Sequence, residues 1–283
     1  MFVDIGVKKF NMDSFHFTES EMESYRNKTS RYFDRRGLEE YLIGQDNYLD
    51  AEKIASDFFP KVNADVFISH SHQDEEDVIK LALTLARLGL SVFVDSCIWG
   101  WANELLRKID NAFCLQNDGY YNYYSRNRTT ANIYMILNCA LQNTISQSEL
   151  LLFLHTDNSI KMNVACESDT YIASPWIFSE LSFARHCQRS SRRRAGTALE
   201  SRGGVENYAY DSADIKFVYP DPGTRYEISN HSFLRWLGKP AFVQGEKNYL
   251  TALNHLDKLY RESGVPEIYL EEPRSLLLSS FRG

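Results

Sequence analysis

Polar side chains that could bind a ligand follow a short apolar segment near residue 70. Residues 64–69, ADVFIS, are typical of a strand that is buried on both faces. Ser69, His70, Ser71 and His72 lie at the end of this segment. Ligands of parallel α/β proteins bind outside the carboxyl ends of strands, and His and Ser side chains can donate hydrogen bonds there. We therefore expect these four residues to contribute to a binding site.

The same residues contain an HxHxD pattern, formed by His70, His72 and Asp74. This pattern is the first part of the metal-binding motif of metallo-β-lactamase-fold hydrolases, in which imidazole and carboxylate ligands hold zinc. That motif normally continues with a further histidine, but this chain has Glu75, and its other five histidines form no second cluster. A zinc-dependent hydrolase is therefore a less favoured alternative. The simpler interpretation is that these polar residues cap the next helix. We assign no metal ligand.

A second candidate is the pair Trp176 and Glu180, which are four residues apart and so share one face of a helix. Ile177 and Ala184 on that face are apolar. A carboxylate among them is partly desolvated unless it lines a cleft. For a WxxxE pair taken alone, the better interpretation is a Glu side chain at the boundary of the core that reaches solvent.

These residues need a scaffold, and the hydrophobic pattern predicts a parallel α/β fold. Apolar residues recur at helical spacing from Val78 to Leu88, Gly89 occupies a C-cap position, and residues 90–95, LSVFVD, form a second strand. Strand, helix and strand within about 30 residues are typical of a right-handed βαβ unit. Further along the chain we predict a helix over 130–140, a strand over 149–155, a helix that starts at Ser174-Pro175, a strand over 214–220 and a helix over 250–260.

The N-terminal 60 residues have a helical and polar pattern, and we predict a small helical extension there. Thr18 and Glu21 have capping-box spacing, and a second short helix begins at Asp50 and stops before Pro60. The predicted organisation is a helical extension over 1–60, one α/β domain over 61–270 with an insertion near 110–130, and a C-terminal tail over 271–283.

Composition restricts the class of partner and the compartment. The chain has 283 residues and a formal net charge of -7, which argues against a general nucleic-acid binder. No apolar run approaches the roughly 18 residues that a membrane span requires, and the N-terminus lacks a signal-peptide core. Five scattered cysteines without a CxxC pattern indicate neither a zinc ribbon nor a disulfide framework. We expect a cytoplasmic protein that binds no membrane.

Aromatic residues are abundant, with 17 Tyr, 17 Phe and 4 Trp. Residues 120–128 combine four tyrosines with two arginines, a mixture found in proteins that bind single-stranded nucleic acid. Because the chain is acidic, we favour an insertion that packs on the domain or mediates assembly.

Taken together and in order, the segments VFISHSHQDE, LSVFVDSCIWGW, ELLLFLHT and SPWIFSELSFA resemble a bacterial Toll/interleukin-1 receptor (TIR) domain. The resemblance runs from about Asp65 to Tyr219 and implies a flavodoxin-like parallel sheet flanked by helices. The long 110–130 stretch and the N- and C-terminal segments depart from the family. Standalone proteins of this layout resemble those of bacterial antiphage systems, including Thoeris-type signal producers.

The resemblance implies cleavage of the bond between nicotinamide and ribose in NAD+, which would be a substrate and not a cofactor. It maps the catalytic glutamate onto Glu180, where a carboxylate would stabilise the oxocarbenium-like cation on the ribose. Trp176 would form an aromatic wall beside the nicotinamide. The remaining substrate-binding residues that it implies are Ser69, His70, Ser71, His72 and, in a mobile loop after the second strand, Asp95, Trp99, Gly100 and Trp101.

Several features stay open at this point. The tryptophans are equally consistent with core packing. Free ADP-ribose, a cyclic ADP-ribose isomer or a conjugate are all compatible with one glutamate, and a downstream effector that senses the product would be a partner. The resemblance implies self-association through the TIR domain. The competing class is a non-enzymatic TIR scaffold that only assembles with partners, and the helical Glu with its Trp favours the enzyme.

Overall fold

A five-stranded parallel sheet forms the centre of the protein in the computed structural model, which describes residues 1–30, 38–43, 48–58, 64–94, 96–162, 170–172, 174–190, 219–239 and 249–270. The strand order is β10-β1-β6-β4-β5, and each neighbouring pair is parallel. The bounds are β1 Val3–Lys8, β4 Val66–Ser69, β5 Val92–Val94, β6 Leu150–Leu154 and β10 Tyr226–Ser229. The prediction of an α/β fold with a parallel sheet is confirmed.

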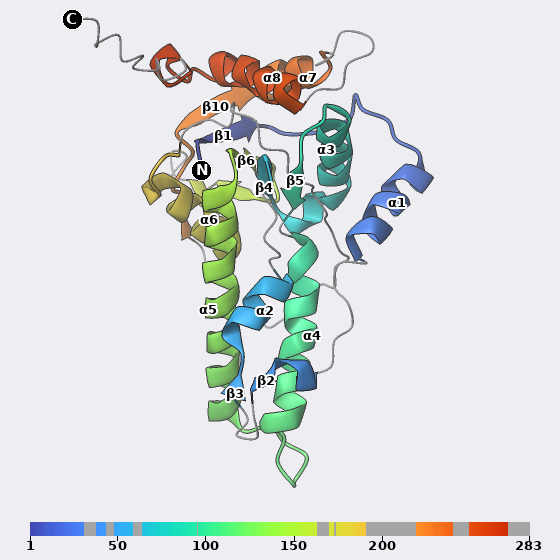
Figure 1. The fold of residues 1–283 in the computed structure, drawn as a ribbon, viewed down its shortest axis with the longest axis vertical. Coiled ribbons are helices and arrows are strands. Elements are labelled where there is room, and N and C mark those ends of the chain that lie inside the picture. The colour runs from blue at the N-terminus through green and yellow to red at the C-terminus, as the bar shows by residue number, and fades with distance from the viewer. Residues whose placement is uncertain are drawn as a thin grey trace, which may run out of the picture.

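Helices cover both faces of this sheet, which gives three layers (Figure 1). One face packs against α3 (Glu75–Arg87), α7 (Asn230–Leu237) and α8 (Tyr249–Glu262). The other face packs against α4 (Ser96–Phe113), α5 (Tyr123–Gln147) and α6 (Pro175–His186). Strands that are buried on both faces need apolar side chains at consecutive positions, and the five residues of β6, LLLFL, are all buried for this reason.

The βαβ unit that the sequence predicts is present as β4, α3 and β5. Strands β4 and β5 are parallel, with Val66 opposite Val92. Val78, Leu81, Ala82 and Leu85 on α3 are buried against the sheet. Gly89 ends the helix with a φ of 84°, a left-handed conformation that costs glycine little.

The first residues of the chain differ from the prediction. Val3–Lys8, which we expected in a helical extension, form β1 between β6 and β10 in the middle of the sheet. The helical prediction is therefore wrong for these residues. Val3, Ile5 and Val7 are completely buried, whereas the interrupting Asp4 and Gly6 have low strand propensity and obscure the pattern in the sequence.

The two predicted N-terminal helices are present as α1 (Glu19–Ser30) and α2 (Ala51–Phe58). The capping box is formed as the spacing indicates. The Thr18 backbone N–H donates to Glu21 Oε2 at 2.9 Å, and the Glu21 N–H donates to Thr18 Oγ1 at 3.3 Å.

The position of β1 also explains the strand order. In a flavodoxin-like sheet the strands, numbered along the chain, lie side by side in the order 2-1-3-4-5. Here β5, β4 and β6 occupy the positions of strands 2, 1 and 3, and β10 occupies the position of strand 5. The place between β6 and β10 is filled by β1, the first strand of the chain. The sheet is compatible with a flavodoxin-like arrangement in which the N-terminus supplies an internal strand.

A helical arm projects from the sheet, formed by α4 and α5 (Figure 1). The predicted helix over 130–140 is much longer, since α5 spans 25 residues and so extends about 37 Å. The predicted insertion near 110–130 is the turn between these two helices, closed by a β-bridge between Leu115 and Tyr121. Helix α2 packs between α4 and α5, near the hairpin of β2 (Leu42–Ile43) and β3 (Tyr48–Leu49). Within the described ranges, no helix combines the length and apolarity that a membrane crossing needs.

The remaining elements are short. A three-stranded antiparallel sheet contains β7 (Ile160–Met162), β8 (Thr170–Ile172) and β9 (Tyr219–Pro220). The 3-10 turns are η1 (Leu38–Tyr41), η2 (His72–Asp74) and η3 (Glu267–Tyr269). Only the last two residues of the predicted strand over 214–220 are described, and the tail over 271–283 lies outside the described residues.

The internal position of β1 leads to a stability prediction. Ile5→Ala removes a completely buried side chain, and we expect the free energy of unfolding to fall by about 2–5 kcal/mol in urea titrations. The matched control is Ile268→Ala, because Ile268 is 75% exposed, and it should change stability by less than about 0.5 kcal/mol. Equal effects of the two substitutions would show that β1 is not part of the core.

Candidate functional site

The carboxyl edge of the sheet brings the predicted Ser-His residues together with the loop that follows β6. Strands β4 and β6 are parallel neighbours with Ser69 opposite Phe153. The segments that leave them, which start at His70 and His155, therefore emerge at the same edge. Ligands of open α/β sheets bind at such an edge.

The four predicted residues differ in accessibility. Ser69 and His70 are buried, Ser71 is half-buried and His72 is exposed. The buried hydroxyl of Ser69 has no hydrogen-bond partner among the described residues. Nδ1 of His70 lies 3.3 Å from the carbonyl oxygen of Ile68. A buried hydroxyl without a partner is costly, and Ser69 is therefore a better ligand candidate than an ordinary core residue.

Asp74 joins the two loops at this edge. Its carboxylate accepts a hydrogen bond from Thr156 Oγ1 at 2.6 Å and another from Asn158 Nδ2 at 2.6 Å. Sequence reasoning did not single out Thr156 or Asn158. The available signal was the polar run that directly follows the apolar strand β6, in the same way as Ser69–Asp74 follows β4. The two hydrogen bonds fix the position of the η2 turn.

The HxHxD residues do not form a metal centre in the described part of the chain. Asp74 binds Thr156 and Asn158, and His72 points to solvent-exposed surface. Across the described ranges, no three His, Cys, Asp or Glu side chains are placed to hold a metal ion together. The geometry of these residues gives the zinc-hydrolase alternative no support.

Helix α6 carries the second predicted pair. Its N-terminus is formed as predicted: Ser174 is the N-cap and accepts a hydrogen bond from the Ile177 N–H, with Pro175 at the first turn. Glu180 is 0% exposed and lies on the helix face that buries Ile177, Leu181 and Ala184. These apolar neighbours pack in one cluster with Phe67, Leu151 and Phe153 of the sheet.

Trp176 is half-buried and contacts α5. Its ring lies 5.5 Å from that of Tyr134 in an edge-to-face arrangement with an interplanar angle of 71°. One turn further, Ser179 Oγ donates to Asn138 Oδ1 of α5 at 2.6 Å. Burial raises the pKa of the Tyr134 phenol. Trp176 thus packs between α6 and α5.

Strand alternation places three candidate residues on the same face of the sheet. Phe67 and Phe153 belong to the core between the sheet and α5–α6. Ser69 and His155 each follow one of these residues by two positions, so their side chains point to the same face. Glu180 reaches this face from α6. The structure therefore places a hydroxyl, an imidazole and a carboxylate between the sheet and the helix layer of α5–α6.

His155 is a residue that sequence reasoning missed. Its ring occupies the space left by Gly6 on β1: a Cβ at Gly6 would lie 2.5 Å from His155 Nε2 and 2.6 Å from Thr224 Oγ1. Nε2 is buried and has no hydrogen-bond partner among the described residues. Burial lowers the pKa of His155, partly offset by Asp221 and Glu227. A glycine within the strand sequence VDIGVK was the available signal.

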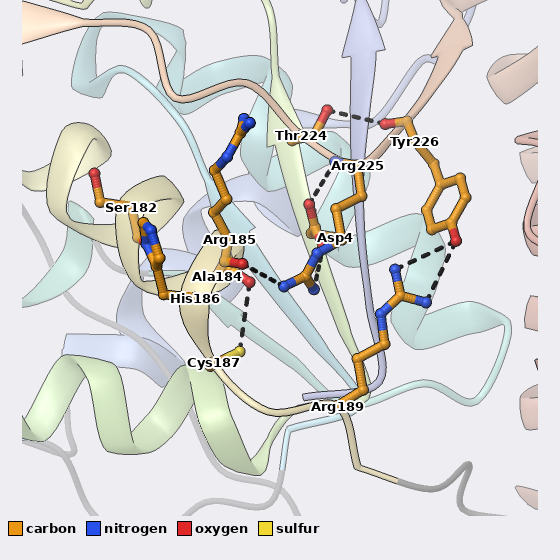
Figure 2. A network of polar contacts seen from close by, with 10 residues as sticks. All are labelled: Asp4, Ser182, Ala184, Arg185, His186, Cys187, Arg189, Thr224, Arg225 and Tyr226. Atoms are coloured by element: carbon orange, nitrogen blue, oxygen red, sulfur yellow. Dashed lines mark hydrogen bonds and ion pairs between the residues drawn. The ribbon is translucent and has the colours of Figure 1, made fainter.

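A polar network holds α6 against the sheet (Figure 2). Asp4 on β1 is 1% exposed and accepts hydrogen bonds from the backbone N–H of Arg225 at 2.7 Å and from its Nη1 at 3.1 Å. Nη2 of Arg225 donates to the carbonyl oxygen of Arg185 near the end of α6 at 2.5 Å. Arg189, just beyond α6, donates to the hydroxyl of Tyr226 at 3.3 Å. The position of Glu180 thus depends on β1 and on the start of β10.

The predicted mobile loop after the second strand is replaced by a helix. Trp99, Gly100 and Trp101 belong to the first turns of α4, so the prediction of a loop is wrong for their backbone. The buried residues Ala102, Leu105, Leu106 and Ile109 recur at helical spacing, and this amphipathic helix extends back to Ser96. The side chains of Trp99 and Trp101 are outside what the structure describes, and so is Asp95.

A scan against protein-family models and searches of curated proteins and solved structures found no match to this chain. The fold and the site define an α/β protein with a parallel sheet and with polar side chains, Ser69, His155 and Glu180, on the face of the sheet that α5 and α6 cover.

The buried Asp4–Arg225 pair leads to a prediction for the anchoring of α6. Arg225→Gln leaves the Asp4 carboxylate buried without its charged partner, and we expect the free energy of unfolding to fall by about 3–5 kcal/mol. The double variant Asp4→Asn/Arg225→Gln removes the uncompensated charge and should recover part of this loss in the same urea titration. A double variant as unstable as the sum of both single variants would contradict this coupling.

The half-buried imidazole of His155 predicts a pH dependence of stability. Its pKa is lower in the folded protein than the ordinary value of 6.5, so the unfolded chain binds a proton first as the pH falls. The stabilising contribution is complete above about pH 6.5 and is lost below it. His255, whose pKa is also lowered by burial, acts in the same direction.

Thermal unfolding at pH 7.5 and pH 5.5 measures this dependence. We expect His155→Gln to lose less stability over this interval than the unsubstituted protein, whereas His72→Gln, which removes an exposed imidazole, should retain the full loss. An unchanged pH dependence in His155→Gln would contradict the assignment.

Proposed function

We propose that this protein cleaves the bond between nicotinamide and ribose in NAD+, as a TIR-like enzyme with a flavodoxin-like sheet. The observation that carries the proposal is the completely buried carboxylate of Glu180, on the same helix face as the apolar residues Ile177, Leu181 and Ala184. A completely buried glutamate is rare among ordinary core residues, and buried carboxylates are frequent at functional sites. The motif order that resembles TIR domains assigns this same residue the catalytic role.

The chemistry requires little more than a positioned negative charge. Nicotinamide leaves as a neutral ring from a pyridinium, so the leaving group needs little acid catalysis. The positive charge that develops on the ribose is stabilised by a carboxylate beside the anomeric carbon, as in glycoside hydrolysis. In this mechanism Glu180 supplies the charge. Ser69, on the same face of the sheet, would donate a hydrogen bond to a ribose or phosphate oxygen.

The burial of Glu180 has a consequence for turnover. Because the side chain is 0% exposed, NAD+ reaches it only when the elements that cover it separate. The reaction therefore requires a conformation in which the sheet and the helices α5 and α6 are separated enough to admit NAD+. Turnover by the isolated chain should be slow and should rise under conditions that promote assembly.

A non-enzymatic scaffold is the second candidate. Two observations favour it: the closed position of Glu180 and the exposed aromatic side chains at the end of the arm, including Tyr120 and Tyr124. In this alternative the same fold only associates with partners, and Glu180 is a structural residue.

Nicotinamide release from NAD+ distinguishes the two functions. Glu180→Gln keeps the size of the side chain and removes its charge, and we expect turnover to fall by about a hundredfold or more. The matched control is Glu149→Gln, which alters a carboxylate that is 2% exposed, follows α5 and accepts a hydrogen bond from Tyr260 at 2.8 Å. This control should keep most of the activity.

These measurements distinguish a substitution that impairs catalysis from one that impairs folding. Loss of turnover in Glu180→Gln alone, with unchanged circular dichroism, supports the catalytic role. Unchanged turnover in both Glu180→Gln and Glu180→Ala would reject it. Absence of turnover by the unsubstituted protein at every concentration would favour the scaffold.

A further inference from the structure

The turn at the end of the helical arm exposes an unusual amount of aromatic surface. We call residues 113–128 the arm tip. Six of the twelve large hydrophobic side chains that are exposed in the described residues belong to it. Tyr120, Tyr123 and Tyr124 are 74%, 71% and 83% exposed. The turn that joins α4 and α5 lies far from the sheet (Figure 1). Exposed apolar groups gathered in this way are typical of a protein-binding surface.

The arm tip is held in one conformation by its own hydrogen bonds. The Gln116 N–H donates to the carbonyl of Tyr120 at 2.8 Å, and the Asn122 N–H donates to that of Cys114 at 2.7 Å. Gly119 takes a φ of 84° at the turn. Asn122 Oδ1 accepts from the Ser125 N–H at 3.0 Å and so caps α5. Because the backbone is already ordered, binding through these tyrosines loses little conformational entropy.

The charges of this region are balanced. Residues 110–135 contain Asp110, Asp118, Arg126 and Arg128, which together give no net charge. Arg126 Nε lies 2.8 Å from Asp110 Oδ2, and its guanidinium stacks 5.0 Å from the centre of the Tyr121 ring. Surfaces that bind a nucleic acid or an anionic membrane carry an excess of basic residues, whereas residues 110–135 carry no net charge.

The same balance suits a second copy of this chain. Two molecules that each carry a net charge of -7 repel one another over most of their surfaces. At the arm tip this repulsion is locally absent. The exposed base Arg126 is paired with the buried Asp110, which leaves the exposed acid Asp118 and the exposed base Arg128 with no ion pair between them in this described part of the chain. A surface that carries both signs is complementary to itself in a twofold-symmetric contact.

We propose that the arm tip is a self-association surface, through which two copies of this chain pair by their exposed tyrosines. Tyrosine residues are frequent energetic centres of protein interfaces, since a large ring is buried at a small entropic cost. The pairing does not depend on the proposed NAD+ chemistry, because the arm tip contains none of the polar side chains Ser69, His155 and Glu180.

Sedimentation equilibrium of the full chain over a wide concentration range tests the pairing. We expect the unsubstituted protein to dimerise and the Tyr120→Ser/Tyr124→Ser variant to bind itself at least about tenfold more weakly. Ile268→Ser removes another exposed hydrophobic side chain, 75% exposed, and should dimerise normally. A monomer at all concentrations, or equal dimerisation of the tyrosine variant, would overturn the proposal.

Charge variants give a second measurement. Arg128→Glu changes the net charge of residues 110–135 from zero to -2, and Asn117→Lys/Asn127→Lys changes it to +2 at two exposed positions. Each variant alone should dimerise more weakly than the unsubstituted protein, and an equimolar mixture of the two should form mixed dimers. If the two variants fail to associate in the mixture, or if binding to an oligonucleotide or a neutral lipid vesicle replaces dimerisation, the surface has another occupant and the proposal is wrong.

Discussion

The ion pair between Asp4 and Arg225 joins the parts of the molecule on which the candidate site depends. Asp4 lies on the internal strand β1, Arg225 precedes the edge strand β10, and the guanidinium also binds the carbonyl of Arg185 near the end of α6. One buried contact thus fixes the first strand, the last strand and the helix that carries Glu180. Because a buried charge without its partner is strongly destabilising, these three elements must assemble together.

The internal position of β1 follows from the need to cover the sheet on both faces. An internal strand of such a sheet is covered by helices on both faces. Its side chains must therefore be apolar on both faces, or its buried polar side chains must have hydrogen-bond or ion-pair partners. β1 meets the first condition with Val3, Ile5 and Val7 on one face. On the other face it compensates Asp4 with Arg225 and accommodates the His155 ring at Gly6.

The molecule separates its candidate chemistry from its candidate association surface. Ser69 and Glu180 are buried and His155 is half-buried between the sheet and the helix layer, whereas the exposed tyrosines belong to the turn that joins α4 and α5 and to the start of α5. Trp176 and Ser179 connect these regions, because they bind Tyr134 and Asn138 of α5. A displacement of α5 would therefore act directly on α6.

Local patterns were sufficient to predict the parts of the fold in which short-range interactions dominate. The β4–α3–β5 unit, the Thr18–Glu21 capping box and the Ser174–Pro175 start of α6 depend on residues within a few turns of one another, and the structure contains each of them. The place of β1, the helical start of α4 and the pairing of His155 with Gly6 depend on segments that are distant in the chain. The sequence thus made Glu180 a candidate through the order of the segments that resemble a TIR domain. Only the folded chain, which sets Gly6 beside His155 and Arg225 beside Asp4, decided which polar groups are buried with it, because burial and charge compensation arise from contacts between distant segments.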